Sequence, residues 1–268
     1  MEKVIGFIGL GEMGFPMAKN LIKAGYGLNI FDIDKRPLME LEKLGAHIQG
    51  SSGEVARSSE IVMVMVRTPD EVREVIAGKE GLLTEAAPSS IILIMSTIDS
   101  GTAQEMSRLA AEKEVMVLDC PVSGGSPGAE AATLTIIAGG PEEVLKSCRP
   151  MLEVMGKNIF YMGEIGMGES AKLINNLLLM IYMSAAYEAV ALAKKAGVKM
   201  DVLFDLLKVS TGNSWIIQHW DMVNSWKENY VEGGSLDLLY KDIRLALAMG
   251  ESLKVPLHLS ALCNQLRF

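Results

Sequence analysis

Three glycines near the N-terminus have the spacing of a phosphate-binding loop. Gly9, Gly11 and Gly14 form a G-x-G-x-x-G pattern that follows an apolar run and precedes a helical one. Glycines at these places let the backbone turn tightly and approach a pyrophosphate, which N–H groups at the positive end of a helix then hold. The order of strand, glycine loop and helix favours a dinucleotide site over the alternative, a glycine turn without a ligand.

Asp32 is the acidic residue that such a loop requires. It closes the second apolar run, 18 residues beyond Gly14, where a carboxylate accepts hydrogen bonds from a ribose and repels a 2′-phosphate. Asp34 adds a negative charge, and Lys35 and Arg36 partly offset both. The pattern predicts NAD in preference to NADP, with NADP left open. The alternative is that Asp32 only forms a turn at the strand end.

A hydroxyl followed by two glycines comes after a later strand, in the run DCPVSGG at residues 119–125. Backbone N–H groups of such a turn can form an anion-binding nest, and Ser123 adds a side-chain donor. The residues alone favour neither this reading nor that of an ordinary Ser-Gly-Gly loop.

Lys172 and Asn176 stand four residues apart in a long helical pattern, so they share one face, and Asn175 lies on nearly the same face. Desolvation and a nearby nicotinamide cation would both disfavour the charged form of Lys172, which suits it to exchange a proton with a substrate oxygen. The amide of Asn176 would donate a hydrogen bond to the same oxygen. Apolar neighbours argue against the alternative of a solvated helix surface: Ala171, Leu173, Ile174, Leu177 and Leu178.

Other side chains give weaker signals. Thr97 follows a predicted strand, at the edge of the sheet where α/β proteins bind ligands. Lys241 and Asp242 open a helical segment at 243–249 and alone suggest a capping or salt-bridge pair. Trp215 is either a core aromatic or the wall of a pocket. The three cysteines and three histidines lack ligand spacing, so we expect reduced thiols and no metal site.

The elements that must position these residues alternate in type up to about residue 163. The expected strands are 4–8, 28–32, 61–66, 91–95, 115–119, 134–138 and 158–161. The expected helices are 12–24, 37–44, 69–77, 102–114 and 141–155. Continuous apolar runs suit parallel strands buried on both faces, so the pattern predicts an α/β fold with a doubly wound sheet.

The pattern changes after Gly163. Gly163, Gly166 and Gly168 form a joint, and a helical pattern then covers 169–196 and ends at Gly197. Every later apolar segment has helical spacing. We therefore predict a dinucleotide-binding domain at 1–163 and an all-helical domain at 164–268.

Composition excludes several classes of protein. The 268 residues are 49% hydrophobic and 22% charged, which indicates a folded core. A net charge of -8 argues against nucleic acid or an anionic membrane as a partner. The N-terminus runs directly into a strand, which predicts no signal peptide, and Asn175, Asn176 and Glu188 argue against a transmembrane helix at 173–193. We expect a cytoplasmic protein.

Four motifs in order resemble those of the β-hydroxyacid dehydrogenase family, whose members include 3-hydroxyisobutyrate dehydrogenase, tartronate semialdehyde reductase and 4-hydroxybutyrate dehydrogenases. They are the glycine loop with the following MAKNL, DCPVSGG at 119–125, GESAKLINN at 168–176, and Lys241-Asp242. The resemblance covers essentially the whole chain. It implies a Rossmann domain, a long interdomain helix and a helical domain that forms homodimers or homotetramers.

The resemblance also implies hydride transfer between a nicotinamide cofactor and a small β- or γ-hydroxy acid with its aldehyde or keto partner. Lys172 would be the catalytic acid/base and Asn176 its companion. The implied substrate-binding residues are Ser123, Gly124, Gly125, Trp215 and Lys241. The implied cofactor-binding residues are Gly9, Leu10, Gly11, Met13, Gly14, Asp32, Met65, Val66, Thr97 and Lys241.

The chain departs from the family pattern in two ways, and two alternative functions stay open. Members that prefer NADP commonly have Asn-Arg-Thr after the second strand, whereas this chain has Asp-Ile-Asp at 32–34. The chain also stops within a helical pattern at 263–268, which predicts a shortened C-terminus. An imine reductase shares the plan but generally lacks the lysine at position 172. A non-catalytic dinucleotide sensor would need the glycine loop but not the acid/base pair.

Overall fold

The computed structural model describes residues 4–231 and 234–266. The predictions of no signal peptide and of a shortened C-terminus bear partly on residues outside these ranges. The chain divides into two compact units, Met1–Lys172 and Leu173–Phe268. The division into a dinucleotide-binding domain at 1–163 and a helical domain at 164–268 stays a prediction.

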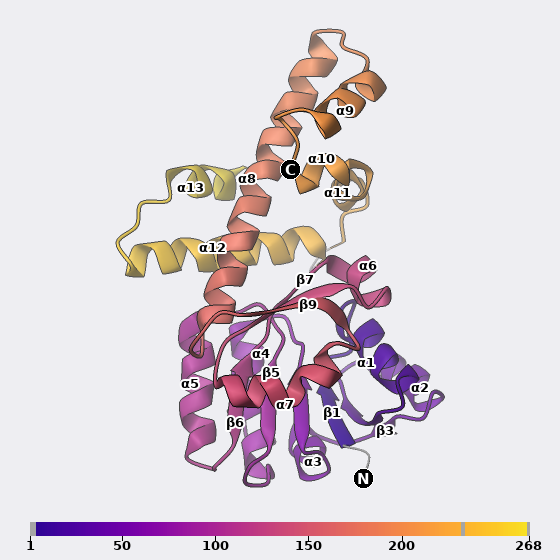
Figure 1. Cartoon of the computed structure of the whole chain (residues 1–268), viewed down its shortest axis with the longest axis vertical. Helices are drawn as coiled ribbons and strands as arrows, with labels where there is room; N and C mark the ends of the chain where they lie inside the picture. The colour runs from indigo at the N-terminus through magenta and orange to yellow at the C-terminus, as the bar shows by residue number, and fades with distance from the viewer. Residues whose placement is uncertain (1–3, 232–233, 267–268) are drawn as a thin grey trace. The chain divides into compact units, whose positions relative to one another are not determined.

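The first unit is built on a six-stranded parallel sheet with the order β3-β2-β1-β4-β5-β6 (Figure 1). Its strands are β1 (Val4–Ile8), β2 (Gly27–Phe31), β3 (His47–Ile48), β4 (Ile61–Val64), β5 (Ile91–Ile94) and β6 (Met116–Asp119). This order reverses direction between β1 and β4, which defines a doubly wound sheet of the Rossmann type. The predicted fold class is confirmed. The edge strand β3, at two residues, is too short to have left a pattern in the sequence.

Both faces of this sheet are buried, which explains the continuous apolar runs. In β4, Ile61 and Met63 pack on one face, whereas Val62 and Val64 pack on the other. The first face is covered by α1 (Gly14–Lys23), α2 (Lys35–Glu42) and α7 (Glu142–Leu152). The second is covered by α3 (Ser52–Arg57), α4 (Pro69–Ala77), the short helix η1 (Leu82–Thr84) and α5 (Ser100–Ala111). Of these, α3 and η1 were not predicted.

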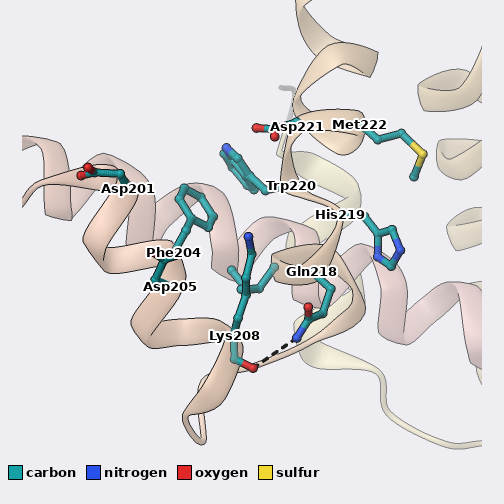
Figure 2. A pocket seen from close by; sticks show the side chains of 10 residues that line it. Asp201, Phe204, Asp205, Lys208, Gln218, His219, Trp220, Asp221 and Met222 are labelled. Atoms are coloured by element: carbon teal, nitrogen blue, oxygen red, sulfur yellow. Dashed lines mark hydrogen bonds between the residues drawn. The ribbon is translucent and has the colours of Figure 1, made fainter.

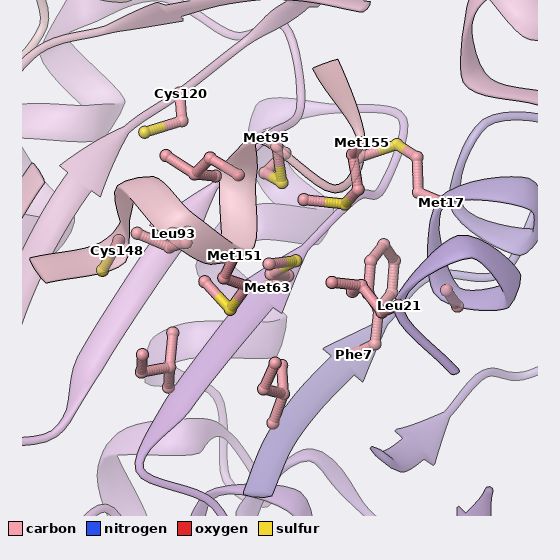
Figure 3. Close-up of a cluster of buried hydrophobic side chains, with 14 of the residues drawn as sticks. Phe7, Met17, Leu21, Met63, Leu93, Met95, Cys120, Cys148, Met151 and Met155 are labelled. Carbon is pink, nitrogen blue, oxygen red and sulfur yellow. The ribbon is translucent and has the colours of Figure 1, made fainter. Parts of the chain in front are cut away.

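The core on the first face is rich in sulfur. Figure 3 shows its buried sulfur-containing side chains, which are Met17, Met63, Met95, Met151, Met155, Cys120 and Cys148. Methionine is unbranched and adaptable, so it fills the irregular gaps that remain where helices cross a twisted sheet.

A smaller sheet follows the main one in the first unit. Its order is β7 (Val122–Ser123), β8 (Leu134–Ala138) and β9 (Gly156–Tyr161), with β7 antiparallel to β8 and β8 parallel to β9. The predicted strands at 134–138 and 158–161 therefore exist, but they lie outside the main sheet. The short helix α6 (Gly125–Glu130), which precedes β8, was not predicted.

In the described residues of the second unit, the regular elements are all helices, as predicted. After α8 (Met167–Lys195), which begins in the first unit, come α9 (Met200–Val209), α10 (Trp215–Gln218), α11 (Trp220–Glu228), α12 (Ser235–Ser252) and α13 (His258–Gln265). Gly197 ends α8 with a φ of 73°, as expected. The prediction that Lys241 and Asp242 open a helix is wrong, because both lie in the interior of α12.

Helix α8 has the length and apolar composition of a membrane-spanning helix. Among the described residues it is the one helix long and apolar enough to cross a membrane by length and composition, with a mean hydropathy of 1.5. In the structure 39% of its apolar window is buried. The absence of a membrane partner and the cytoplasmic location stay predictions.

The carboxylate of Asp119, at the end of β6, caps the start of α8. Its Oδ1 accepts the N–H of Gly166 at 2.7 Å and its Oδ2 accepts the N–H of Glu169 at 2.8 Å. The backbone of Asp119 also exchanges two hydrogen bonds with Gly139, just beyond β8. Burial raises the pKa of Asp119, and the N–H donors act in the opposite direction. One residue thus joins β6, the end of β8 and the first turn of α8.

We expect Asp119→Ala to lower the free energy of unfolding by about 2–4 kcal/mol, because two buried N–H groups lose their acceptor. Asp119→Asn keeps one acceptor oxygen and should cost roughly half as much. As a control, Asp99→Ala removes the cap of α5, where Asp99 accepts the N–H of Thr102, and should cost about 1 kcal/mol. Urea denaturation at pH 7 measures all three.

The pH dependence of these variants has a definite sign. Because the pKa of Asp119 is raised in the folded state, the folded protein binds this proton more tightly than the unfolded chain. Stability from this group is therefore greatest at low pH and is lost as pH rises through the folded pKa. The deficit of Asp119→Asn should widen as pH falls from 7 to 4. A deficit in Asp119→Asn as large as that of Asp119→Ala would contradict the capping role.

Candidate active site

Each of the three glycines in the loop is explained by a different feature of its surroundings. Gly9 has a φ of 89°, and a Cβ there would lie 2.2 Å from the carbonyl oxygen of Met65. At Gly14 a Cβ would lie 1.9 Å from the carbonyl oxygen of Gly9, so α1 packs directly on the loop. At Gly11 nothing lies within 4 Å of the Cβ position. Two glycines are thus required by packing, and the third leaves open backbone that a pyrophosphate could approach.

The other predicted loop residues face the core. Leu10 is buried, and the half-buried Met13 packs against the same cluster. A hollow of about 620 Å³ adjoins the loop and includes Gly11, Glu12 and Ser126 in its lining.

Asp32 holds the glycine loop from the end of β2. Its Oδ2 accepts the N–H of Leu10, and its Oδ1 accepts the N–H of Asp34 at 2.7 Å. The turn role proposed as the alternative is therefore real, although a carboxylate oxygen can accept more than one hydrogen bond. Beside it Ile33 is 94% exposed. Ile33 is not among the site residues predicted from the sequence. An apolar residue between two aspartates at the end of a strand is a pattern that could have indicated an exposed apolar contact for a ligand.

Arg36 is engaged with Asp34. Its side-chain Nη2 lies 2.8 Å from Asp34 Oδ2, and its backbone N–H donates to Asp34 Oδ1 at 3.0 Å. The side-chain hydrogen bond from Arg36 lowers the pKa of Asp34. Of the two cations expected to offset the aspartates, the guanidinium is thus paired with Asp34 and not with Asp32.

The loops after β4 and β5 lie at the same edge of the sheet. The N–H of Val66 donates to Ser96 Oγ at 2.9 Å, and the N–H of Met65 donates to the carbonyl of Ile8 at 2.8 Å. Thr97 is half-buried between the buried Ser96 and Ile98. The structure therefore places the predicted cofactor residues of the first unit along the carboxyl edge of its strands, where α/β sheets bind ligands.

The Ser-Gly-Gly turn adjoins the glycine loop. Ser123 is on β7, and Gly124 and Gly125 have φ values of 135° and 63°, in the region that favours glycine. The next residue, Ser126, donates its hydroxyl to Glu12 Oε1 in the glycine loop at 3.1 Å. The turn thus has a backbone conformation that glycine adopts readily at both positions, which explains the two glycines.

Lys172 and Asn176 lie one turn apart on α8 and are 7% and 6% exposed. The expected apolar surroundings are only partly as predicted, because Ile174 and Leu178 are exposed. The helix does have an exposed face, which includes Ile174 and Leu178, whereas Lys172 and Asn176 are buried. Asn175 is also exposed and donates to Asn176 Oδ1 at 3.0 Å.

Asn176 is held by a residue that sequence reasoning assigned only to a salt bridge. Its Nδ2 donates to Asp242 Oδ2 at 2.6 Å. Asp242 Oδ1 lies 3.1 Å from Lys241 Nζ, which confirms the ion pair. The amide of Asn176 has a second N–H, and Asp242 fixes the direction in which the amide points.

Trp215 is 43% exposed and begins α10, where its ring stacks on His219 with the centroids 4.3 Å apart. The core reading is therefore wrong. A pocket of about 320 Å³ lies nearby between α9 and α11 (Figure 2), but Trp215 does not line it. Its lining includes Asp201, Asp205, Lys208 and Trp220 and none of the predicted site residues. Nowhere in residues 4–231 and 234–266 do three or more His, Cys, Asp or Glu side chains form a group that could hold a metal ion.

Comparison with known proteins agrees with this geometry. The family model for the NAD binding domain of 6-phosphogluconate dehydrogenase matches residues 4–163, and that for the NAD-binding domain of NADP-dependent 3-hydroxyisobutyrate dehydrogenase matches residues 166–267. The chain is 38% identical to 3-hydroxyisobutyrate dehydrogenase of Pseudomonas aeruginosa over 98% of its own length and 90% of that protein. It is also 38% identical to the NAD-dependent L-serine dehydrogenase of the same organism, over 91% and 84% of the two chains.

Solved structures place the chain in the same group. A Mycobacterium tuberculosis 3-hydroxyisobutyrate dehydrogenase, in a structure described with L-serine, has a TM-score of 0.87 and 32% identity over 98% of this chain and 92% of that one. An imine reductase from Myxococcus stipitatus has a TM-score of 0.72 at 18% identity over 97% and 91% of the two chains, which indicates a shared fold alone. The chain belongs to the β-hydroxyacid dehydrogenase family, whose enzymes are NAD(P)-dependent oxidoreductases that act on the CH–OH group of small hydroxy acids.

Proposed function

We propose that Lys172 is the proton donor and acceptor of this hydroxyacid dehydrogenase. The observation that carries the proposal is the burial of Lys172 on the second turn of α8, whose first turn is fixed by Asp119 to the carboxyl edge of the sheet. That edge also holds the glycine loop and Thr97. Burying a lysine at such a place costs free energy, so its presence there is typical of a residue with a chemical role or a buried partner.

The residues of the first unit suit a dinucleotide, because the open backbone at Gly11 leaves room for a pyrophosphate. Gly9, Gly14, Asp32 and the exposed Ile33 would hold it, with Ile33 against the adenine ring. Met65, Val66, Thr97 and Lys241 would complete the site. When bound, the nicotinamide would donate or accept the hydride. NAD is preferred because Asp32 is acidic and Arg36 is paired with Asp34.

The proposed substrates are 3-hydroxy acids that vary at C2. The substrates in the names of two relatives, 3-hydroxyisobutyrate and L-serine, are both 3-hydroxypropanoates that differ only in a methyl or an ammonium group at C2. Ser123 and the N–H groups of Gly124 and Gly125 would bind the shared carboxylate. Trp215 and Lys241 would contact the remainder of the substrate.

The proton then has a defined path. In the oxidising direction C3 of the substrate loses a hydride and its hydroxyl loses a proton, which the neutral Nζ of Lys172 takes up. In the reducing direction the ammonium returns that proton to the carbonyl oxygen. The second N–H of Asn176, oriented by Asp242, would donate to the same oxygen. Fixing the substrate carboxylate and this oxygen together holds C3 in place for the transfer.

Lys172→Ala should lower kcat by roughly 10²–10⁴ because acid-base catalysis is lost. Lys172→Arg should not restore it, since a guanidinium keeps its proton. Dinucleotide affinity, measured by fluorescence, should remain near wild type in both. Lys157→Ala, at an exposed lysine on β9, serves as the control and should be fully active. Near-normal turnover in Lys172→Ala would exclude the mechanism, and activity on imines in place of hydroxy acids would favour the imine reductase. Binding without turnover in the wild type would favour the sensor.

Asp32→Asn separates the charge of Asp32 from its contact with the loop. Because the amide oxygen can still accept the N–H of Leu10, the loop should persist while the ratio of kcat/KM for NAD over NADP falls about tenfold or more. Asp34→Asn should raise NADP use, because it weakens the hold on Arg36. Steady-state kinetics with both cofactors measures these ratios. A wild type that strongly favours NADP would refute the preference.

We further propose a homodimer or homotetramer formed by the helical unit. No residue of α9 is buried, and apolar side chains on α8, α9 and α13 are exposed, including Leu178, Tyr182, Leu192, Val202, Leu206 and Leu262. Exposed apolar surface of this kind is typical of protein interfaces.

Leu206→Glu should shift the assembly toward the monomer, because the carboxylate would be buried in the interface without a partner. Size-exclusion chromatography with light scattering measures the mass. Met39→Glu is the matched control, since Met39 is exposed on α2 in the other unit. A monomeric wild type at micromolar concentration would refute the proposal.

A further inference from the structure

We propose that Glu169 is a positioning residue that ties the loop carrying Thr97 to the start of α8, and so sets the place of Lys172 relative to that loop. The inference rests on the proposed function for its effect on catalysis. The contact itself does not depend on that function, because it lies wholly within the first unit.

Glu169 is held from two sides. Its Oε2 accepts the N–H of Ile98 at 3.0 Å, and its own N–H donates to Asp119 Oδ2 at 2.8 Å. The side chain of Glu169 is fully buried, with 0% of its surface exposed. Burying a carboxylate is costly unless hydrogen bonds compensate, so a glutamate here indicates a specific structural requirement.

The loop on the other side of this contact is anchored at both of its ends. Ser96 Oγ accepts the N–H of Val66 at 2.9 Å, which fixes the loop to the end of β4. The N–H of Ile98 is fixed to α8 through Glu169. Thr97 lies between these two anchors, so its position is defined relative to both elements.

Lys172 follows Glu169 by three residues, so one helical turn carries the anchor and the proposed proton donor. Rotation or translation of this turn would move Nζ of Lys172 away from a substrate held at the sheet edge. A misplacement of about 1 Å can cost about 10²-fold in rate. Asp119 fixes the backbone of this turn to β6, and Glu169 adds the second fixed point, on the loop after β5.

Two substitutions at Glu169 separate its acceptor from its bulk. Glu169→Gln keeps an oxygen that can accept the N–H of Ile98, whereas Glu169→Met fills similar volume without an acceptor. We expect Glu169→Met to lower kcat about 10–100-fold with dinucleotide affinity changed less than about threefold, and Glu169→Gln to stay within about threefold of wild type. Leu152→Ala, at a buried apolar site on α7 that takes no part in these hydrogen bonds, controls for lost stability and should keep normal kcat at temperatures where it is folded.

Hydrogen exchange gives a readout that does not require activity. In the unliganded protein, peptides containing Ile98 and residues 166–172 should exchange faster in Glu169→Met than in wild type, Glu169→Gln or Leu152→Ala. Unchanged exchange at Ile98 in Glu169→Met would overturn the contact and with it the proposal. Faster exchange together with an unchanged kcat would also overturn it, because Glu169 would then be only structural.

If the proposed function is wrong, the same experiments give a different result. A wild type that binds the dinucleotide but turns over no hydroxy acid, while Glu169→Met still accelerates exchange at Ile98, would remove the catalytic role of Lys172. The link from the Thr97 loop to α8 would be supported by that result.

Discussion

Buried N–H groups at the start of a helix need acceptors, and in the first turn of α8 Asp119 supplies them. The same residue ends β6 and pairs through its backbone with Gly139 beyond β8. The carboxylate of Asp119 therefore fixes the first turn of α8 to the end of β6, and Lys172 follows within the same unit. A negative charge is also favourable at this end of a helix, which offsets part of the cost of burying it.

The remainder of the sheet edge follows the same scheme, in which each loop is fastened by one side chain from its neighbour. Asp32 holds the glycine loop, Ser96 holds the end of β4, and Glu169 holds the loop after β5. Each anchor satisfies a backbone N–H that a buried loop would otherwise leave without a partner. The loops thus gain a defined geometry from protein contacts alone, which lowers the ordering cost when a ligand binds.

Local sequence patterns predicted the glycine loop and the buried strands, because these depend on neighbouring residues and on continuous apolar runs that are buried on both faces of the sheet. The anchors could not be read in this way. Glu169 and Ile98 are 71 residues apart in the chain, and nothing near either residue indicates the other. The error at Lys241 had a readable signal, because Leu236, Leu239 and Tyr240 already have helical spacing before it. Trp215 and β3 depended on tertiary packing, which short segments do not encode.

On the proposed function, an acidic protein binds two anions, a pyrophosphate and a substrate carboxylate, against a net charge of -8. Charges on the surface are screened beyond a Debye length of about 8 Å at physiological ionic strength, so the overall charge has little effect inside the site. What decides binding there is the set of donors within hydrogen-bond distance. Backbone N–H groups at Gly11 and at Gly124 and Gly125 are neutral donors whose direction the fold fixes. Because these donors are neutral, on the proposed function they would bind the two anions without themselves adding positive charge to the site.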